Sequence, residues 1–240
     1  MKGIKKTLVA GILACATFNA QAEVSPFGYG IKAGGGFSSA VGYGDKVKIG
    51  GKDAQGTFFD HFVAFGKLYG EYAFTDYIGF GLEAGYMGQG ASLTGEDNQG
   101  GNTNSSTIAM SNHGIATELS LCVYPLGREA EEGILKVMIG GAPYFSFASS
   151  YKADNSELTL SDNQKKEKVP FDVAVTGGIG YELPFGLSFE VKYGYGFMNR
   201  FNTDQGRDQT IYSNVSELKK LRIQYGTVGL GYNFASLFSE

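Results

Sequence analysis

The sequence FVAFGKLYGEYAFTDYIGFGLEAGY, residues 62–86, decides the fold. Two segments alternate in polarity with a period of two residues, and they meet at the short polar break Thr75-Asp76. A period of two is typical of a β-strand with two unlike faces. Uncharged residues occupy every second position, whereas the charged residues Lys67, Glu71 and Glu83 fall between them. The stretch therefore predicts a long β-hairpin whose apolar face must meet either a protein core or a lipid.

The first 22 residues are typical of an export signal. They begin with three lysines, continue through the apolar run TLVAGILACATF and end in Ala-Gln-Ala. A basic segment, a short apolar core and an A-x-A site indicate a secretory signal peptide, since a spanning helix needs about 20 apolar residues. We expect cleavage between Ala22 and Glu23, which leaves one domain at residues 23–240. The alternative is a lipoprotein box, which Ile12–Cys15 weakly resembles.

Composition favours a folded and acidic exported domain. The chain has 20 Lys and Arg against 24 Asp and Glu, and the signal removes three lysines, so the formal charge falls from −4 to −7. An acidic protein gives no electrostatic reason to expect nucleic acid as a partner. Cys122 is the only cysteine after cleavage, so an intramolecular disulfide cannot form, and we interpret it as a small filler residue. The 15 Tyr and 18 Phe argue against the disorder that 37 Gly would suggest.

The alternation recurs in eight segments of strand length. These are residues 26–37, 62–74, 77–86, 108–124, 135–147, 171–183, 187–197 and 218–234. The connections alternate between short turns and long polar loops, and the long ones span about 38–56, 92–107, 150–169 and 202–216. Pro143 suggests a bulge or an interrupted pairing, and a change of phase suggests a second bulge near Gly226.

This pattern predicts an all-β protein: an eight-stranded antiparallel up-and-down transmembrane β-barrel with long extracellular loops and short periplasmic turns. No apolar run after the signal approaches the length of a spanning helix, and without one only a closed barrel satisfies every backbone group in lipid. A water-soluble, lipocalin-like barrel is the alternative at the level of the fold.

Charged residues predict which face of each strand meets lipid. A Lys or Arg on the lipid face near the midplane costs about 2–4 kcal/mol. We therefore expect the charged strand positions to point into the barrel and to form a charge network: Lys32, Lys67, Glu71, Glu83, Glu118, Lys136, Asp172, Glu182, Glu190, Lys192 and Arg222. The interior of an eight-stranded barrel is just wide enough for side chains to fill it. The near balance of acids and bases favours an ion-paired plug over an open channel.

With these features and the closing GTVGLGYNF at residues 226–234, the chain resembles the small bacterial outer-membrane β-barrel superfamily, including OmpA-like and opacity-protein-like barrels. The resemblance covers all of residues 23–240. It implies contact with outer-membrane lipid and lipopolysaccharide, and recognition by the outer-membrane insertion machinery through an aromatic-rich final strand that ends in Phe. Because this chain continues to Glu240, Phe238 is a second candidate for that terminal Phe. We do not expect a peptidoglycan-binding module after the barrel.

We predict no catalytic, cofactor-binding or metal site. A barrel enzyme that modifies lipid A would combine His with Ser and an acid, and Ser111, His113 and Glu118 lie close in sequence. Glu118, however, falls on the other face of the predicted strand from Ser111 and His113. His61 and His113 are the only histidines, and two histidines without further ligands make a poor metal site. The glycine-rich run at 79–84 lies within a strand pattern, which excludes a nucleotide-binding loop.

Three functions therefore remain open. The favoured one is a non-enzymatic barrel with a structural or adhesin-like surface role, because binding residues concentrate in loops on a rigid scaffold. Its expected partner is an extracellular or host ligand. The alternatives are a narrow passive channel for small solutes and a lipid A-modifying enzyme.

Overall fold

The computed structural model describes most of the chain after the predicted signal. The described residues are 25–41, 48–49, 52–55, 61–99, 102–128, 133–153, 156–157, 170–198 and 222–238. The predicted signal peptide, its cleavage site between Ala22 and Glu23, and the predicted loop at 202–216 lie outside these ranges.

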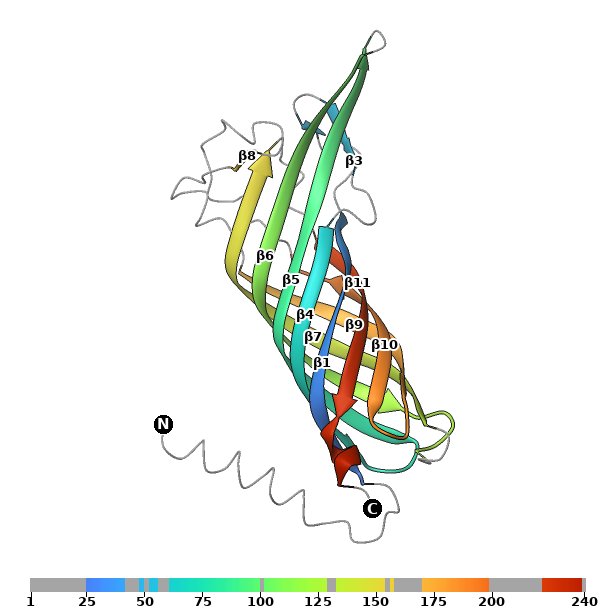
Figure 1. Cartoon of the computed structure of the whole chain (residues 1–240). Helices are drawn as coiled ribbons and strands as arrows, with labels where there is room; N and C mark the ends of the chain where they lie inside the picture. The colour runs from blue at the N-terminus through green and yellow to red at the C-terminus, as the bar shows by residue number, and fades with distance from the viewer. Residues whose placement is uncertain are drawn as a thin grey trace, which may run out of the picture.

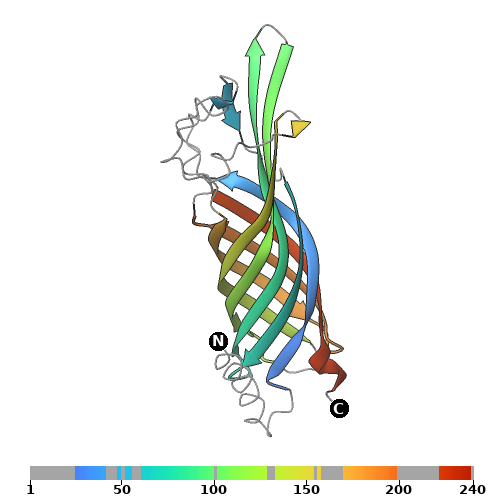
Figure 2. The same ribbon diagram turned by 90° about the vertical axis from the view of Figure 1, so that its left-hand side faces the viewer.

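Eight long antiparallel strands form a closed barrel (Figures 1 and 2). They are β1 (Phe27–Val41), β4 (His61–Ala73), β5 (Ile78–Gln99), β6 (Asn102–Val123), β7 (Ile134–Ala153), β9 (Phe171–Glu182), β10 (Leu187–Gly196) and β11 (Arg222–Asn233). Each strand pairs with its neighbour along the chain, and the pairing of β1 with β11 closes the ring. The predicted eight-stranded barrel is confirmed.

The outer wall is apolar on every strand of the ring. One large aliphatic residue from each of the eight strands is about half exposed or more: Ile31, Leu68, Leu82, Leu119, Ile139, Ile179, Val191 and Leu230. A soluble protein rarely exposes such a continuous apolar surface, whereas a transmembrane barrel requires one. The apolar face of the hairpin at 62–86 is part of this wall.

Short turns join the strands at one end of the barrel, which we call the turn end. Between β4 and β5, the Thr75 hydroxyl accepts hydrogen bonds from the amides of Tyr77 and Ile78, at 3.2 and 3.1 Å. Between β9 and β10, Gly186 has a φ of +90°, a conformation that side chains disfavour. The predicted turns at 75–76 and 184–186 are therefore present.

The opposite end, which we call the hairpin end, differs from the predicted set of loops. Strands β5 and β6 remain paired from Ile78↔Val123 to Gln99↔Asn102, so the predicted polar loop at 92–107 is instead an extension of the hairpin beyond the barrel (Figure 1). The prediction was wrong because a two-stranded ladder forms through backbone groups and does not need an apolar face. The Thr94 and Thr107 hydroxyls, 3.0 Å apart, add a cross-strand hydrogen bond.

Parts of two other predicted loops also contain strands. Strands β2 (Lys48–Ile49) and β3 (Lys52–Gln55) lie within the predicted loop at 38–56, and β3 pairs with the extended part of β5. Strand β7 continues to Ala153 and pairs with β8 (Ser156–Glu157) in the predicted loop at 150–169.

Of the two predicted irregularities, one is present. The ladder between β6 and β7 has no paired partners for Thr117 and Glu118, beside Pro143, and its register shifts between His113 and Gly114. The predicted bulge near Gly226 was wrong, because β11 keeps one register with both neighbours. The change of phase arises instead because apolar residues at the start of β11 point into the barrel.

A short 3-10 helix, η3 (Phe234–Leu237), follows β11 at the turn end. No helix in the described part of the chain has the length and apolar character to cross a membrane.

Candidate functional site

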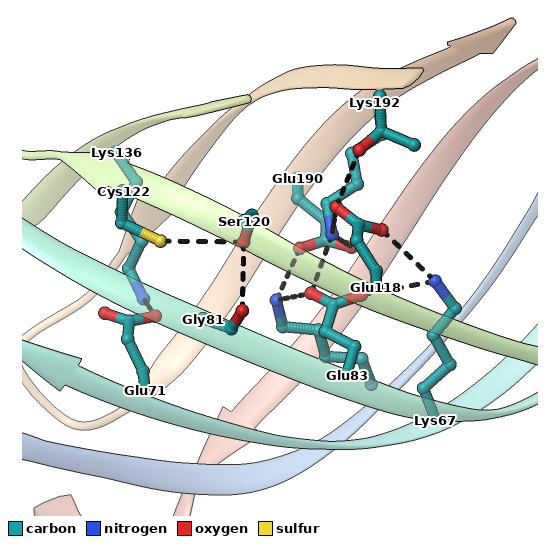
Figure 3. Close-up of polar contacts among 12 residues, drawn as sticks. Lys67, Glu71, Gly81, Glu83, Glu118, Ser120, Cys122, Lys136, Glu190 and Lys192 are labelled. Carbon is teal, nitrogen blue, oxygen red and sulfur yellow. Dashed lines mark hydrogen bonds and ion pairs between the residues drawn. The ribbon is translucent and has the colours of Figure 1, made fainter. Parts of the chain in front are cut away.

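The barrel interior holds a cluster of three lysines and three glutamates, which we call the central ion cluster (Figure 3). Glu83 on β5 is its centre: its carboxylate lies 2.6 Å from Lys32 Nζ, 2.6 Å from Lys192 Nζ and 3.2 Å from Lys67 Nζ. Around Glu83, Glu118 pairs with Lys67 and Lys192 at 3.5 and 3.3 Å, and Glu190 pairs with Lys32 at 2.7 Å.

The central ion cluster joins strands that are not neighbours. Its members come from β1, β4, β5, β6 and β10, and their side chains are only 2–8 % exposed. Two further contacts complete it: the Thr176 hydroxyl of β9 donates to Glu118 at 3.1 Å, and Lys32 Nζ lies 4.6 Å from the centre of the Tyr69 ring. Because its acids and bases are equal in number, the cluster is neutral when all are ionised.

A second group of charges lies nearer the turns, and we call it the turn-end ion cluster. Lys136 Nζ on β7 lies 2.8 Å from Glu71 on β4 and 2.9 Å from Glu182 on β9. Each carboxylate has one further donor: the Tyr124 hydroxyl to Glu71 at 2.6 Å and the Asn233 amide to Glu182 at 2.7 Å. Buried ions are tolerated only when they are paired and hydrogen-bonded in this way.

Two of the sequence-predicted interior charges lie apart from both clusters. Asp172 is buried on β9 but accepts hydrogen bonds from the amides of Val173 and Met198, at 2.8 and 3.1 Å. Arg222 lies opposite Val41 in the ladder between β1 and β11. In the alternation of β11 it shares the outward-facing side with Gly226 and Val228. This placement corrects the expectation that Arg222 points into the barrel, which assumed a bulge that β11 does not contain.

An apolar layer fills the interior on the hairpin side of the central ion cluster. It consists of Val63, Phe65, Met87, Ala116, Ala142, Tyr144, Ala174 and Tyr225. A small space lined by several of these residues, together with Gln89 and Asp172, has room for about one water molecule. Side chains therefore fill the barrel at three successive levels: the turn-end ion cluster, the central ion cluster and the apolar layer.

Cys122 lies inside the barrel near the turns. It is buried with Ala73, Tyr124, Ile134 and Met138, and its Sγ lies 3.9 Å from the Ser120 hydroxyl. These contacts match those of a small packing residue.

The candidate catalytic residues do not converge. Glu118 points into the barrel and pairs with two lysines, whereas His113 is exposed on the outer wall. The Nδ1 atom of His113 lies 2.7 Å from the Tyr86 hydroxyl. Among the described residues, no group of three or more His, Cys, Asp or Glu side chains has the arrangement of a metal site.

Several interior residues were not identified from the sequence. Tyr124 and Asn233 donate hydrogen bonds to the carboxylates of the turn-end ion cluster. Each lies at the end of a strand, where the alternation of residues does not predict the direction of a side chain.

The apolar layer was missed because strands at this level carry apolar residues on the inward face as well as on the outer wall, so the contrast between the two faces disappears. Ile223 and Tyr225, which are buried in the barrel, are examples. The available signal was that apolar residues take over the inward positions at the hairpin end of several strands, as Val63 and Phe65 do on β4.

Solved structures similar to this chain include those of Ail, OprG and CarO. Ail, the attachment invasion locus protein of Yersinia pestis, in complex with the heparin analogue sucrose octasulfate, has 13% identity and a TM-score of 0.34, over 87% of this chain and 99% of Ail. OprG from Pseudomonas aeruginosa has 15% identity and a TM-score of 0.40, over 87% and 94%. CarO from Acinetobacter baumannii has 12% identity and a TM-score of 0.39, over 89% and 100%. No curated protein matches the chain.

The assignment of the chain to a family rests on a family model. The model for an outer membrane protein β-barrel domain matches residues 19–202, which is more than half of the chain. The match agrees with the closed barrel, its apolar outer wall and its charged interior. The chain belongs to the outer membrane β-barrel domain family, and the protein resides in the bacterial outer membrane.

Proposed function

We propose that this protein is a non-conducting, non-enzymatic barrel that acts at the cell surface through its hairpin end. Short turns of outer-membrane barrels face the periplasm and long connections face the outside, so the extension of β5 and β6 would project into the medium. Binding residues usually lie on such projecting segments of a rigid scaffold. The observation that supports this proposal best is the filled interior, which leaves the projecting segments as the accessible part.

The filled interior argues against a passive channel. A solute would have to separate the ion pairs of Glu83 with Lys32 and Lys192, both at 2.6 Å, and then cross the apolar layer. Separating a buried pair leaves an uncompensated charge, at a cost of about 3–5 kcal/mol. We therefore expect no stable single-channel steps when the purified protein is inserted into planar bilayers. Regular conductance steps at neutral pH would instead support the channel.

The surface role requires a separate test of the projecting hairpin. Thr94 and Thr107 are paired, so residues 95–106 can be replaced by Asn-Gly, a two-residue turn that joins paired strands. We expect proteoliposomes that carry the intact protein to bind at least one member of a panel of immobilised extracellular polysaccharides and matrix proteins. The shortened protein should lose that binding while the barrel remains folded.

The matched control keeps the length of the hairpin and scrambles the order of residues 95–106. If the scrambled hairpin binds as well as the natural one, recognition does not depend on this sequence. If the intact protein binds nothing in the panel and the shortened protein behaves identically, the surface-binding role is contradicted. Folding is checked for each variant by heat-modifiable migration in gels.

A further inference from the structure

The outward side of β11 changes in chemistry along its length. Its turn-end half presents Leu230 and Val228, which are exposed apolar residues of the outer wall. Toward the hairpin end the next outward positions are Gly226, Gln224 and Arg222, and we call all five residues the wall row. Successive members are about 7 Å apart, because a strand rises about 3.4 Å per residue. The wall row therefore passes from an apolar surface to an amide and then to a guanidinium.

Gly226 leaves a hollow in the outer wall between two aromatic residues. It lies opposite Phe37 of β1 and Tyr193 of β10, and both aromatic side chains are 44 % exposed. A Cβ atom on Gly226 would have no other atom within 4 Å, so the space above this glycine is open. Because Val228 follows toward the turns, an acyl chain can lie along the wall row and enter this hollow.

The Gln224 carboxamide is held firmly on the hairpin side of the hollow. Its Oε1 accepts a hydrogen bond from the Tyr193 hydroxyl at 2.7 Å, and its Nε2 donates to the Ser39 hydroxyl at 3.0 Å. These contacts join β10, β11 and β1 across the outer face. A hydroxyl both donates and accepts, so Tyr193 can still accept a hydrogen bond and Ser39 can still donate one. The group is suited to the hydroxyls of a sugar.

Arg222 has no partner for its charge within the described part of the chain. Its Nε is buried without a hydrogen-bond acceptor, and no described carboxylate pairs with the guanidinium. By contrast, each lysine of the two ion clusters has a carboxylate partner. A charge on the outer wall is tolerated near the membrane interface, where the anionic groups of lipids lie. The planar guanidinium matches the oxygens of a phosphate.

We propose that the wall row, with Tyr193 and Ser39, binds one lipopolysaccharide molecule of the outer leaflet through its lipid A portion. Arg222 would hold a phosphate, the polar groups around Gln224 a sugar, and the hollow at Gly226 an acyl chain. Lipid A is a phosphorylated sugar that carries acyl chains, so it presents these three groups together, whereas a glycerophospholipid has no sugar ring. The site lies on the barrel wall, and it shares with the proposed function only the outward orientation of the hairpin end.

The test measures lipid binding to the folded protein in detergent. The probes are lipid A, lipid A from which the phosphates have been removed, and phosphatidylglycerol, and bound molecules are counted by native mass spectrometry during a titration. We expect one saturable lipid A per chain. The other two lipids should bind roughly tenfold more weakly or worse, since a hydrogen bond to a charged group contributes at least that factor.

Substitution of Arg222 separates phosphate recognition from general contact with lipid. Arg222→Gln should bind lipid A only as weakly as the unmodified protein binds the phosphate-free form, and Arg222→Lys should recover part of the loss. Lys152→Gln is the matched control, because it removes an exposed cation at the hairpin end of β7 and should bind like the unmodified protein.

Substitution of Gly226 tests the hollow. Gly226→Leu should fill it and weaken the binding of both forms of lipid A by a similar factor. Gly141→Leu is the matched control: Gly141 of β7 also has no atom within 4 Å of an added Cβ, and this change should have no effect. Heat-modifiable migration confirms that each variant is folded.

The lipid site and the surface role can fail separately. Replacing residues 95–106 by Asn-Gly should leave lipid A binding intact, whatever it does to the binding of extracellular ligands. Four results would overturn the lipid site: equal affinity of the unmodified protein for both forms of lipid A, equal affinity for phosphatidylglycerol, unchanged binding in Arg222→Gln, or loss of lipid A binding in the shortened protein.

Discussion

Lys32 and Glu83 form an ion pair of 2.6 Å across the barrel interior, although their strands, β1 and β5, are not neighbours and 51 positions separate them in the chain. The same oxygen of Glu83 also lies 2.6 Å from Lys192 on β10. One carboxylate therefore joins opposite sides of the barrel wall. This arrangement makes Glu83 the residue whose removal should disturb the interior most.

Glu83→Gln should destabilise the folded barrel by about 3–5 kcal/mol, because it leaves the buried ammonium groups of Lys32, Lys67 and Lys192 with too few carboxylates. The measurement is reversible urea unfolding in lipid vesicles, followed by heat-modifiable migration. Asp76→Asn in the exposed turn is the control and should change stability by no more than about 0.5 kcal/mol. Equal stability of the two variants would contradict a structural role for the central ion cluster.

Lys136→Met should be more harmful than Glu182→Gln. The first change leaves two buried carboxylates, Glu71 and Glu182, without their shared lysine, whereas the second leaves Lys136 paired with Glu71. Adding Glu71→Gln to Lys136→Met should recover part of the loss, with a coupling free energy of about 0.5–3 kcal/mol. The same urea assay measures all variants, and strictly additive effects would show that these residues do not form one unit.

Leu119→Arg should destabilise the barrel in vesicles by about 2–4 kcal/mol, because Leu119 is 59 % exposed on the apolar outer wall, where arginine would meet lipid. Leu126→Arg is the matched control: Leu126 is 71 % exposed but lies in the turn after β6, where the cost should be about 0–1 kcal/mol. If the two variants lose the same free energy, the assignment of the outer wall to the membrane is wrong.

Asn233→Ala should cost about 1–3 kcal/mol, the usual penalty for leaving buried polar groups unpaired. The Asn233 side chain accepts from the amides of Tyr29 and Ala235 and donates to Glu182, so it links β1, β9 and η3. Asn233→Asp keeps the acceptor but replaces the donor with a charge beside Glu182, so we expect it to be the less stable variant. The opposite order would mean that the donated bond to Glu182 is unimportant.

The alternation of residue types was sufficient to predict the barrel and the direction of most charged side chains. Every second residue of a strand must face the same side, and a charge facing lipid is costly, so Lys67, Glu71 and Glu83 could be assigned to the interior without a structure. Loop lengths could not be predicted with the same success. The polar residues at 92–107 have the composition of a loop, yet backbone pairing continues through nearly all of them.

The candidate site was predictable in its members but not in its pairing. The alternation of residues along each strand predicts that Lys32, Glu83 and Lys192 point into the interior. The level of each residue along the barrel axis depends on the register between strands, which the sequence does not give. For the same reason, Arg222 was assigned to the wrong face, since its phase relative to Val228 depended on whether β11 contains a bulge.

The sequence by itself determined the class of the protein: a period of two, with apolar residues on one face and charges on the other, specifies strands between lipid and a polar interior. Only the tertiary structure decided which charges pair, that an apolar layer lies on the hairpin side of them, and that β5 and β6 continue as a paired hairpin beyond the barrel. The physical reason is that side-chain direction is a local property of a strand, whereas register and closure arise from hydrogen bonds between strands distant in sequence.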